Sequence, residues 1–164
     1  MAHDADILIV GGGLNGPCLA LACAQAGLSS IVIDALAQDT RMGGQFDGRS
    51  YALALASVRM LDALGLWDGL SDHAQPILQI KASDGRAGEG AAPFFLHFDS
   101  AELEEGPMGH MLEDRHLRRT LLAAMDDHPR ITHRPGISVV AQATDGAARV
   151  TLADGSDLTG RILV

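Results

Sequence analysis

The chain has 164 residues, of which 47% are hydrophobic and 20% charged, and its formal net charge at pH 7 is -9. This length and balance are typical of one globular domain with a sizeable core. The acidic excess argues against nucleic acid or an anionic membrane surface as an electrostatic partner.

The N-terminus and the cysteines indicate a soluble protein of a reducing compartment. The first residues include His3 and Asp4 without a basic segment, and no apolar run approaches about 18 residues. Cys18 and Cys23 are five positions apart on one predicted helix, which is too far for an unstrained disulfide. We therefore expect a cytoplasmic location, and a peripheral membrane contact made elsewhere stays open. The seven histidines show no metal-site spacing, so we expect no metal.

The chain opens with a predicted strand, turn, helix and strand. Residues 6–34 read DILIVGGGLNGPCLALACAQAGLSSIVID. The apolar run 6–10 predicts a strand, the glycines a turn, residues 14–26 a helix that Gly27 ends, and residues 30–34 a second strand. This order is the start of a βαβ unit.

Three glycines in the turn have the G-x-G-x-x-G spacing of dinucleotide-binding proteins. Gly11 allows the tight turn, Gly13 leaves room for a diphosphate, and Gly16 lets the helix pack closely on the strand. Leu14 and Asn15 then begin the helix, whose unpaired N–H groups and positive dipole end favour an anion. The alternative is that these glycines form a turn with a purely structural role.

Asp34, at the end of the second strand, strengthens the dinucleotide interpretation. An acid there can accept hydrogen bonds from both ribose hydroxyls, and it would repel a 2′-phosphate. NADP is therefore disfavoured at this site. These residues alone do not separate FAD from NAD.

The middle of the chain departs from a simple alternation of strands and helices. Residues 35–48 predict a long loop, residues 49–55 an extended segment, and residues 58–64 a helix with Ser57 as N-cap and Gly65 at its end. A short irregular helix follows. Residues 76–84 and 94–99 predict two strands joined by the loop GRAGEGAA, an excursion of the kind that carries substrate contacts.

The last third predicts a return to the sheet. Residues 114–127 form an amphipathic helix with Leu117, Leu121, Leu122 and Met125 on its apolar face. A strand at 131–134 rejoins the parallel sheet, segments 136–144 and 147–153 form an antiparallel meander, and residues 160–164 form a final strand. We therefore predict an α/β, Rossmann-like fold with one nucleotide-binding unit, cut off after Val164, because a buried parallel strand should lead into a ligand-binding loop.

Three stretches resemble the N-terminal part of the single-component FAD-dependent aromatic hydroxylases related to para-hydroxybenzoate hydroxylase. They are DILIVGGGLNGPCLALACAQAG at 6–27, DGRSYALALASVRMLDALGLW at 47–67 and GHMLEDRHLRRTLLAAM at 109–125. The second and third are more family-specific than the first. The resemblance is greatest to the ubiquinone-biosynthesis branch, which hydroxylates polyprenylated phenols, and it implies a glutathione reductase-like FAD-binding fold.

The resemblance also implies roles for particular residues. The glycine turn and Asp34 would hold the FAD diphosphate and adenosine ribose, and Arg49 would lie against the cofactor. Asp114 stands where relatives carry Arg, Gln or Asn facing the cofactor, so it is either a cofactor contact or an N-cap of its own helix. Arg115 is the alternative cofactor neighbour, and Arg49 could also be a solvated loop residue.

For the whole enzyme, the resemblance implies that NAD(P)H reduces FAD and that O₂ supplies the oxygen placed on an electron-rich aromatic ring. The cofactor carries this chemistry, so we name no catalytic residue. Relatives continue well beyond the last strand, so this chain reads as an N-terminal FAD-binding fragment, with the start of the substrate excursion at about 76–110. A fragment with exposed apolar surfaces is expected to self-associate.

Two other functions stay open at this point. An NAD-dependent dehydrogenase shares the opening motif, but residues 47–67 and the strand excursion argue against it. A non-catalytic nucleotide-binding module is the second alternative. Partners of the parent protein are a small aromatic substrate and, as open questions, a membrane surface or a biosynthetic complex.

Overall fold

The structure, a computed structural model, describes residues 3–41, 43 and 45–164. Residues 42 and 44 of the predicted loop lie outside the described residues. The chain divides into two compact units, one made of residues 1–47 and 114–164, and the other of residues 48–113. Each unit is described separately.

The first unit contains a six-stranded sheet with the order β8-β2-β1-β11-β10-β9. The strands are β1 Ala5–Val10, β2 Ser30–Asp34, β8 Ile131–Pro135, β9 Val139–Ala143, β10 Ala148–Leu152 and β11 Asp157–Leu163. Strands β8, β2, β1 and β11 are parallel, whereas β10 and β9 pair antiparallel. The predicted parallel sheet with an antiparallel meander is confirmed.

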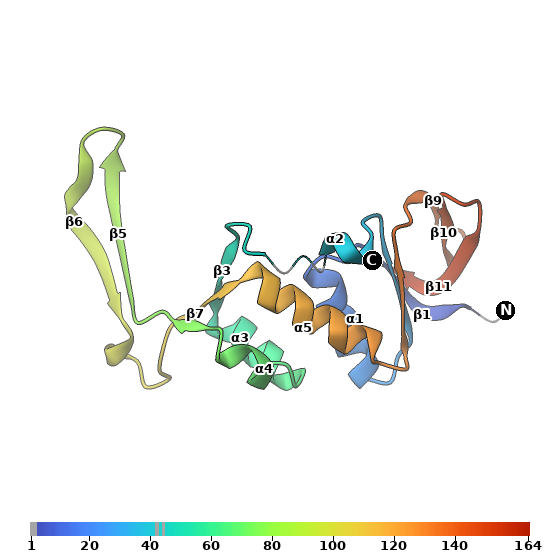
Figure 1. Cartoon of the computed structure of the whole chain (residues 1–164), viewed down its shortest axis with the longest axis horizontal. Helices are drawn as coiled ribbons and strands as arrows, with labels where there is room; N and C mark the ends of the chain where they lie inside the picture. The colour runs from blue at the N-terminus through green and yellow to red at the C-terminus, as the bar shows by residue number, and fades with distance from the viewer. Residues whose placement is uncertain (1–2, 42, 44) are drawn as a thin grey trace. The chain divides into compact units, whose positions relative to one another are not determined.

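Two helices lie side by side on the parallel strands (Figure 1). Helix α1 (Asn15–Gln25) follows the glycine turn, and Gly27 ends it with a φ of 85°, a left-handed conformation that suits glycine. Helix α5 (Asp114–Asp126) buries the predicted apolar face of Leu117, Leu121, Leu122 and Met125. The short helix α2 (Gln38–Arg41) interrupts the predicted loop.

Strand β11 belongs to both halves of the sheet. It pairs parallel with β1, where Ile7 lies opposite Ile162, and antiparallel with β10, where Val150 lies opposite Leu158. The prediction of a separate final strand at 160–164 is therefore wrong in extent, because the strand begins at Asp157 and is also the third strand of the meander. A core cluster of Leu8, Ile31, Ile33, Val150 and Leu152 joins the meander to the parallel strands.

The second unit holds a small three-stranded sheet and a separate two-stranded one. The first has the order β3-β7-β4, from Ser50–Ala54, Gly109–Glu113 and Gln75–Pro76. Helices α3 (Leu55–Ala63) and α4 (Asp68–Ser71) lie between β3 and β4 in the chain, and residues Ser100–Glu102 form a 3₁₀ turn. The predictions of a helix ending before Gly65 and of a short irregular helix after it are confirmed.

Ser57 is not the N-cap of α3, contrary to the sequence prediction. The helix begins at Leu55, the residue before it is Ala54, and Ser57 lies in the first turn. Strand β3 leads directly into the helix, with Ala54 still paired to Gly109. The pairing of β3 with β7 therefore sets the start of the helix, and this contact is not visible in the local sequence.

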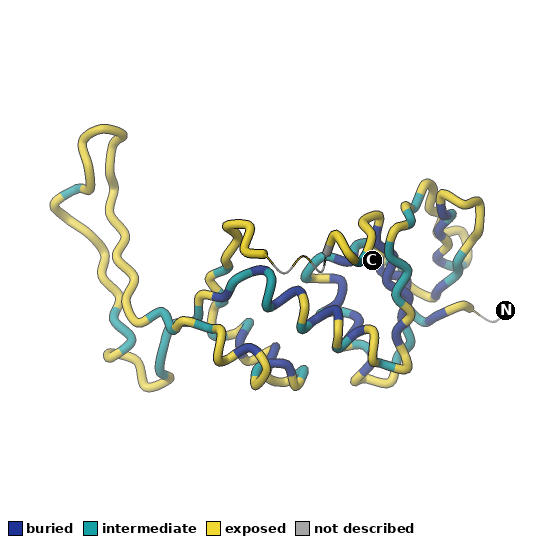
Figure 2. The backbone as a smooth tube through the Cα atoms, viewed as in Figure 1, coloured by how far each residue is buried: buried dark blue, intermediate teal, exposed yellow. Residues whose placement is uncertain are grey.

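Strands β5 (Gln79–Arg86) and β6 (Gly90–Asp99) form an antiparallel hairpin, here called the β5–β6 ribbon. The predicted loop GRAGEGAA is wrong in extent, because pairing continues to Arg86 and Gly90. Gly85 makes this possible, since a Cβ atom there would lie 2.9 Å from the Gly90 carbonyl oxygen. Figure 2 shows that the ribbon is exposed almost throughout, whereas burial is concentrated in the first unit.

Candidate functional site

A cavity of about 280 Å³ lies at the carboxyl end of β1, where α1 begins. Its lining combines the glycine turn with apolar residues of the neighbouring elements: Ile9, Val10, Gly11, Gly13, Leu14, Asn15, Gly16, Leu19 and Val164. The structure thus brings together five of the residues predicted to bind a cofactor. In parallel α/β sheets, ligands bind outside the carboxyl ends of the strands, and this cavity has that location.

Gly11 and Gly16 are required by the geometry of the turn itself. Gly11 has a φ of 128°, and its N–H donates to the Ile33 carbonyl oxygen at 2.8 Å, which ties the turn to β2. A Cβ atom at Gly16 would lie only 1.9 Å from the Gly11 carbonyl oxygen. The helix can therefore approach the strand only with glycine at position 16.

Gly13 differs, because protein packing does not require a glycine there. A Cβ atom at this position would meet no protein atom within 4 Å, and the residue lines the cavity. A side chain would therefore occupy open space in the cavity. This arrangement fits a ligand whose atoms approach the backbone closely at Gly13.

The start of α1 presents backbone donors to the same cavity. Leu14 occupies the N-cap position and provides no side-chain cap, and the first turn contains no acidic residue. Uncapped N–H groups and the positive end of the helix dipole favour a bound anion. The site can thus hold a diphosphate through backbone groups alone.

Asp34 ends β2 and lies beside the turn. Its side chain is buried, with the residue only 4% exposed, and Oδ1 accepts a hydrogen bond from the Leu36 N–H at 3.0 Å. Gly12 of the turn lies close to this side chain, because a Cβ atom there would lie 2.5 Å from Asp34 Oδ2. Gly12 was not among the predicted site residues, although the run of three glycines in the sequence was a signal for it.

Arg49, Asp114 and Arg115 are placed on other elements. Arg49 belongs to the second unit, directly before β3, and is exposed. Asp114 and Arg115 are the first two residues of α5 in the first unit, with Asp114 buried and Arg115 partly buried. Their contacts with a cofactor stay predictions.

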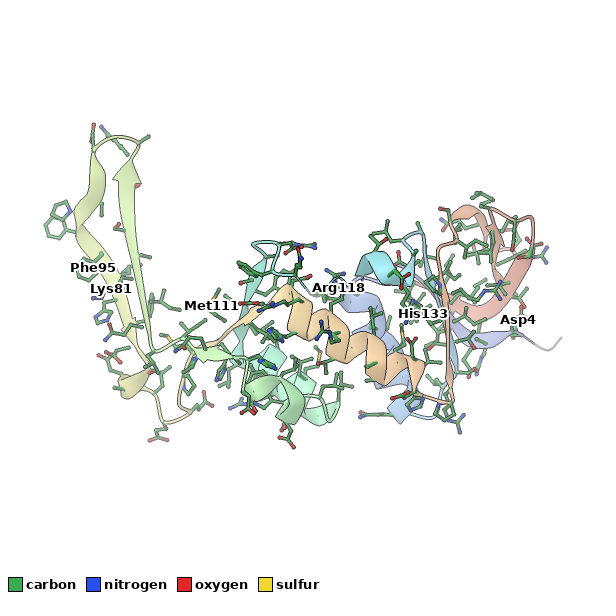
Figure 3. The ribbon with its side chains drawn as sticks, viewed as in Figure 1. Asp4, Lys81, Phe95, Met111, Arg118 and His133 are labelled. Atoms are coloured by element: carbon green, nitrogen blue, oxygen red, sulfur yellow. The ribbon has the colours of Figure 1, made fainter. Side chains whose placement is uncertain are left out.

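The carboxylate of Asp114 has a cationic partner that the sequence analysis missed. Arg118, one helical turn further along α5 (Figure 3), donates through Nη2 to Oδ1 at 2.6 Å and through Nε to Oδ2 at 3.0 Å. Both residues are at most 6% exposed. The i, i+4 spacing in the sequence was the available signal. This pair compensates the negative charge of the buried Asp114 carboxylate.

No nucleophilic or metal-binding constellation stands out in the described part of the chain. Burial raises the pKa of the Cys18 thiol, so that Cys18 stays protonated near neutral pH. No group of three or more His, Cys, Asp and Glu residues among those described could hold a metal ion. Within the same described residues, no helix is long and apolar enough to cross a membrane.

The family model described as "FAD binding domain" matches residues 4–159 of the chain. Ubiquinone hydroxylase UbiL of Rhodospirillum rubrum is 42% identical over 161 residues, a match covering 98% of this chain and 36% of that protein. The 3-demethoxyubiquinol 3-hydroxylase of Escherichia coli K12 is 30% identical, with 99% of this chain and 41% of that protein covered. This chain therefore spans about two fifths or less of the length of these relatives.

Solved structures show the same fold. The flavin-dependent monooxygenase PieE, in complex with FAD and substrate, superposes with a TM-score of 0.72 at 21% identity. The match covers 99% of this chain and 30% of that one. The fold described above thus occurs in a known protein whose structure contains FAD.

Proposed function

We propose, since this chain belongs to the FAD binding domain family, that it is the FAD-binding part of a flavin monooxygenase that hydroxylates an aromatic ring. FAD is accordingly the cofactor, which decides the choice between FAD and NAD that the glycine motif left open. The observation that carries the proposal is the cavity at the uncapped start of α1, where Gly13 is open and Asp34 lies beside the turn.

The predicted cofactor-binding residues would divide the binding of FAD between them. Backbone N–H groups from Gly13 to Gly16 would bind the diphosphate, and Asp34 would accept hydrogen bonds from the adenosine ribose. Arg49 or Arg115 would supply a cation near the diphosphate, because the helix end alone compensates only part of its charge. Asp114, neutralised by Arg118, would then be tolerated near the cofactor.

When bound, FAD supplies the redox chemistry, with NAD(P)H as reductant and O₂ as the source of the transferred oxygen. The residues of this chain bind and orient the cofactor. Because no side chain here is needed as a general base, the proposal assigns no catalytic residue to this chain.

The substrate class is proposed from the relatives. The relatives named above are a ubiquinone hydroxylase and a 3-demethoxyubiquinol 3-hydroxylase, so we propose a polyprenylated phenol as the substrate of the longer protein. Residues 76–110 would make some of the contacts with this substrate. The rest of the substrate pocket would be formed by parts of the protein outside this chain, and the chain alone is expected to be inactive.

Titration of the purified chain with FAD tests the proposal. Binding would shift the flavin absorption bands and quench flavin fluorescence. The variant Gly13→Ala should weaken this binding while keeping the unfolding midpoint, because its Cβ atom would meet no protein atom within 4 Å. Binding of NAD with no response to FAD would instead favour a dehydrogenase, and binding of neither would favour a non-catalytic module.

Self-association of this chain through the β5–β6 ribbon is part of the proposal. Phe94 is 88% exposed and Leu96 66%, and exposed apolar patches of this kind mark contact surfaces. We expect the molecular mass from light scattering to rise with concentration, and the variant Phe94→Ser, Leu96→Ser to lower it. A monomer at every concentration would contradict this expectation.

We also propose that the longer protein is cytoplasmic, with any contact to a membrane surface or biosynthetic complex peripheral. Fractionation of cells that express the full-length protein, with and without a high-salt wash, checks this location.

A further inference from the structure

We infer that Gly12 is a positioning residue for Asp34. The absence of a side chain at Gly12 lets the Asp34 carboxylate lie against the glycine turn, in the orientation that meets the adenosine ribose. The inference rests on the proposed binding of FAD. It concerns a residue that the G-x-G-x-x-G spacing leaves unspecified.

The contact between the two residues is too close for any side chain at position 12. A Cβ atom on Gly12 would lie 2.5 Å from Oδ2, 2.8 Å from Cβ and 3.0 Å from Cγ of Asp34. Cβ atoms almost never approach other atoms within 3.0 Å. Three atoms of the Asp34 side chain are involved, so a rotation of the carboxylate alone would not relieve the overlap.

Hydrogen bonds and strand pairing hold Asp34 in place. Its Oδ1 accepts from the Leu36 N–H at 3.0 Å, and its carbonyl oxygen accepts from the Ile137 N–H at 3.0 Å. The residue is also paired with Pro135 of β8 in the parallel sheet. A displacement of the side chain would therefore break the Leu36 hydrogen bond, and a displacement of the backbone would disturb the sheet.

Contacts of Gly11 also hold the glycine turn in place. The Gly11 N–H donates to the Ile33 carbonyl oxygen at 2.8 Å, and the Gly11 carbonyl oxygen lies directly over Gly16. Hydrogen bonds thus oppose movement of both the turn and Asp34. A methyl group at position 12 would be accommodated only by a shift of the whole Asp34 side chain, which takes the carboxylate out of its native position.

A change at Gly12 should affect the binding of only one half of the cofactor. A ribose diol donates hydrogen bonds to a carboxylate, and such charge-assisted bonds depend on orientation. A change at Gly12 should weaken recognition of the adenosine ribose, whereas the flavin half of the cofactor should be unaffected.

The test compares FAD with its 2′-deoxyadenosine analogue as ligands of the wild-type chain and of Gly12→Ala. The wild-type chain should bind the analogue about tenfold more weakly, the scale of one hydrogen bond to a charged group. Gly12→Ala should bind FAD about tenfold more weakly than the wild type does and should bind both ligands alike. The loss of discrimination is a readout that a general loss of stability would not produce.

Two results would overturn the inference. Gly12→Ala could discriminate between the two ligands as well as the wild type does, or the wild type could bind FAD without discriminating at all. The second result would leave FAD binding intact, so it differs from the failure of the proposed function, in which FAD does not bind.

A measurement without ligand tests the contact between Gly12 and Asp34 even if FAD does not bind. Gly12→Ala should lower the thermal unfolding midpoint, and it should lower it much less in an Asp34→Gly background, which removes all three opposing atoms. Equal shifts in both backgrounds would overturn the inference. Gly13→Ala serves as the folding control, because its Cβ atom meets nothing within 4 Å.

Discussion

The sheet of the first unit and the ribbon of the second unit use apolar residues in opposite ways. In the first unit, Leu8, Val32, Val150 and Leu152 are fully buried. In the ribbon, Ile80 pairs with Phe98 on one face, and both are about half exposed. A two-stranded hairpin is at best marginally stable by itself in water, whereas the six-stranded sheet has its own core. The candidate cofactor site thus lies on the unit that contains the buried six-stranded sheet, and the ribbon is a surface available for contacts.

The strongest test of this comparison uses one ion pair from each unit. Arg118→Met removes the partner of the buried Asp114 carboxylate and should lower the free energy of unfolding by about 4 kcal/mol. Arg59→Met breaks an exposed pair with Glu105, in which both side chains are more than 60% exposed, and should cost at most about 0.5 kcal/mol. Urea denaturation measures both.

Equal costs for the two arginine variants would contradict the comparison. The double variant Asp114→Asn, Arg118→Met should recover part of the lost stability, because it removes the uncompensated charge as well.

Two leucines provide an apolar version of the same test. Leu121 on α5 is 1% exposed and Leu96 in the ribbon is 66% exposed. Leu121→Ala should lower the free energy of unfolding by about 3 kcal/mol, because it leaves a cavity. At concentrations low enough for the chain to be monomeric, Leu96→Ala should change it by less than about 0.5 kcal/mol. Thermal and urea unfolding should agree, and a large effect of Leu96→Ala would mean that the ribbon face is covered in solution.

The glycine turn allows a comparison within the first unit. Gly16→Ala should lower the free energy of unfolding by at least about 2 kcal/mol, because its Cβ atom would overlap the Gly11 carbonyl oxygen. Gly13→Ala should leave the unfolding midpoint almost unchanged. Similar unfolding midpoints for both variants in differential scanning calorimetry would show that the turn can shift to accommodate a Cβ atom at position 16.

The smallest expected effect depends on pH. Hydrogen bonds from the Ser29 backbone N–H and hydroxyl lower the pKa of Asp6. Because the folded-state pKa is the lower one, ionised Asp6 stabilises the fold above its unfolded pKa of about 3.9, and this stabilisation is lost as the pH falls through the folded value. Asp6→Asn should therefore lower the unfolding midpoint at pH 7, and this difference should shrink as the pH falls below about 3.9.

Glu104→Gln is the matched control for this pH dependence, because it removes an exposed carboxylate of the other unit. A midpoint difference for Asp6→Asn that stayed constant from pH 7 to pH 3 would contradict the assignment.

Much of the first unit could be predicted from the sequence because its signals are local. The spacing of Gly11, Gly13 and Gly16 follows from the steric needs of a tight turn, and the apolar periodicity of residues 114–127 follows from the helical repeat. Two of the predictions that failed, Ser57 as an N-cap and the loop GRAGEGAA, also used local signals. In both places strand pairing determined the boundary instead.

The sequence by itself determined the βαβ unit, the acid at its second strand and the family resemblance, since each depends on residues close together in the chain. Only the tertiary structure decided that β11 serves two partners, that Arg118 neutralises Asp114 and that Gly12 faces Asp34. Gly12 and Asp34 are 22 positions apart, and β1 and β11 lie at opposite ends of the chain. Such contacts depend on how the elements pack in space, which no local pattern of residues encodes.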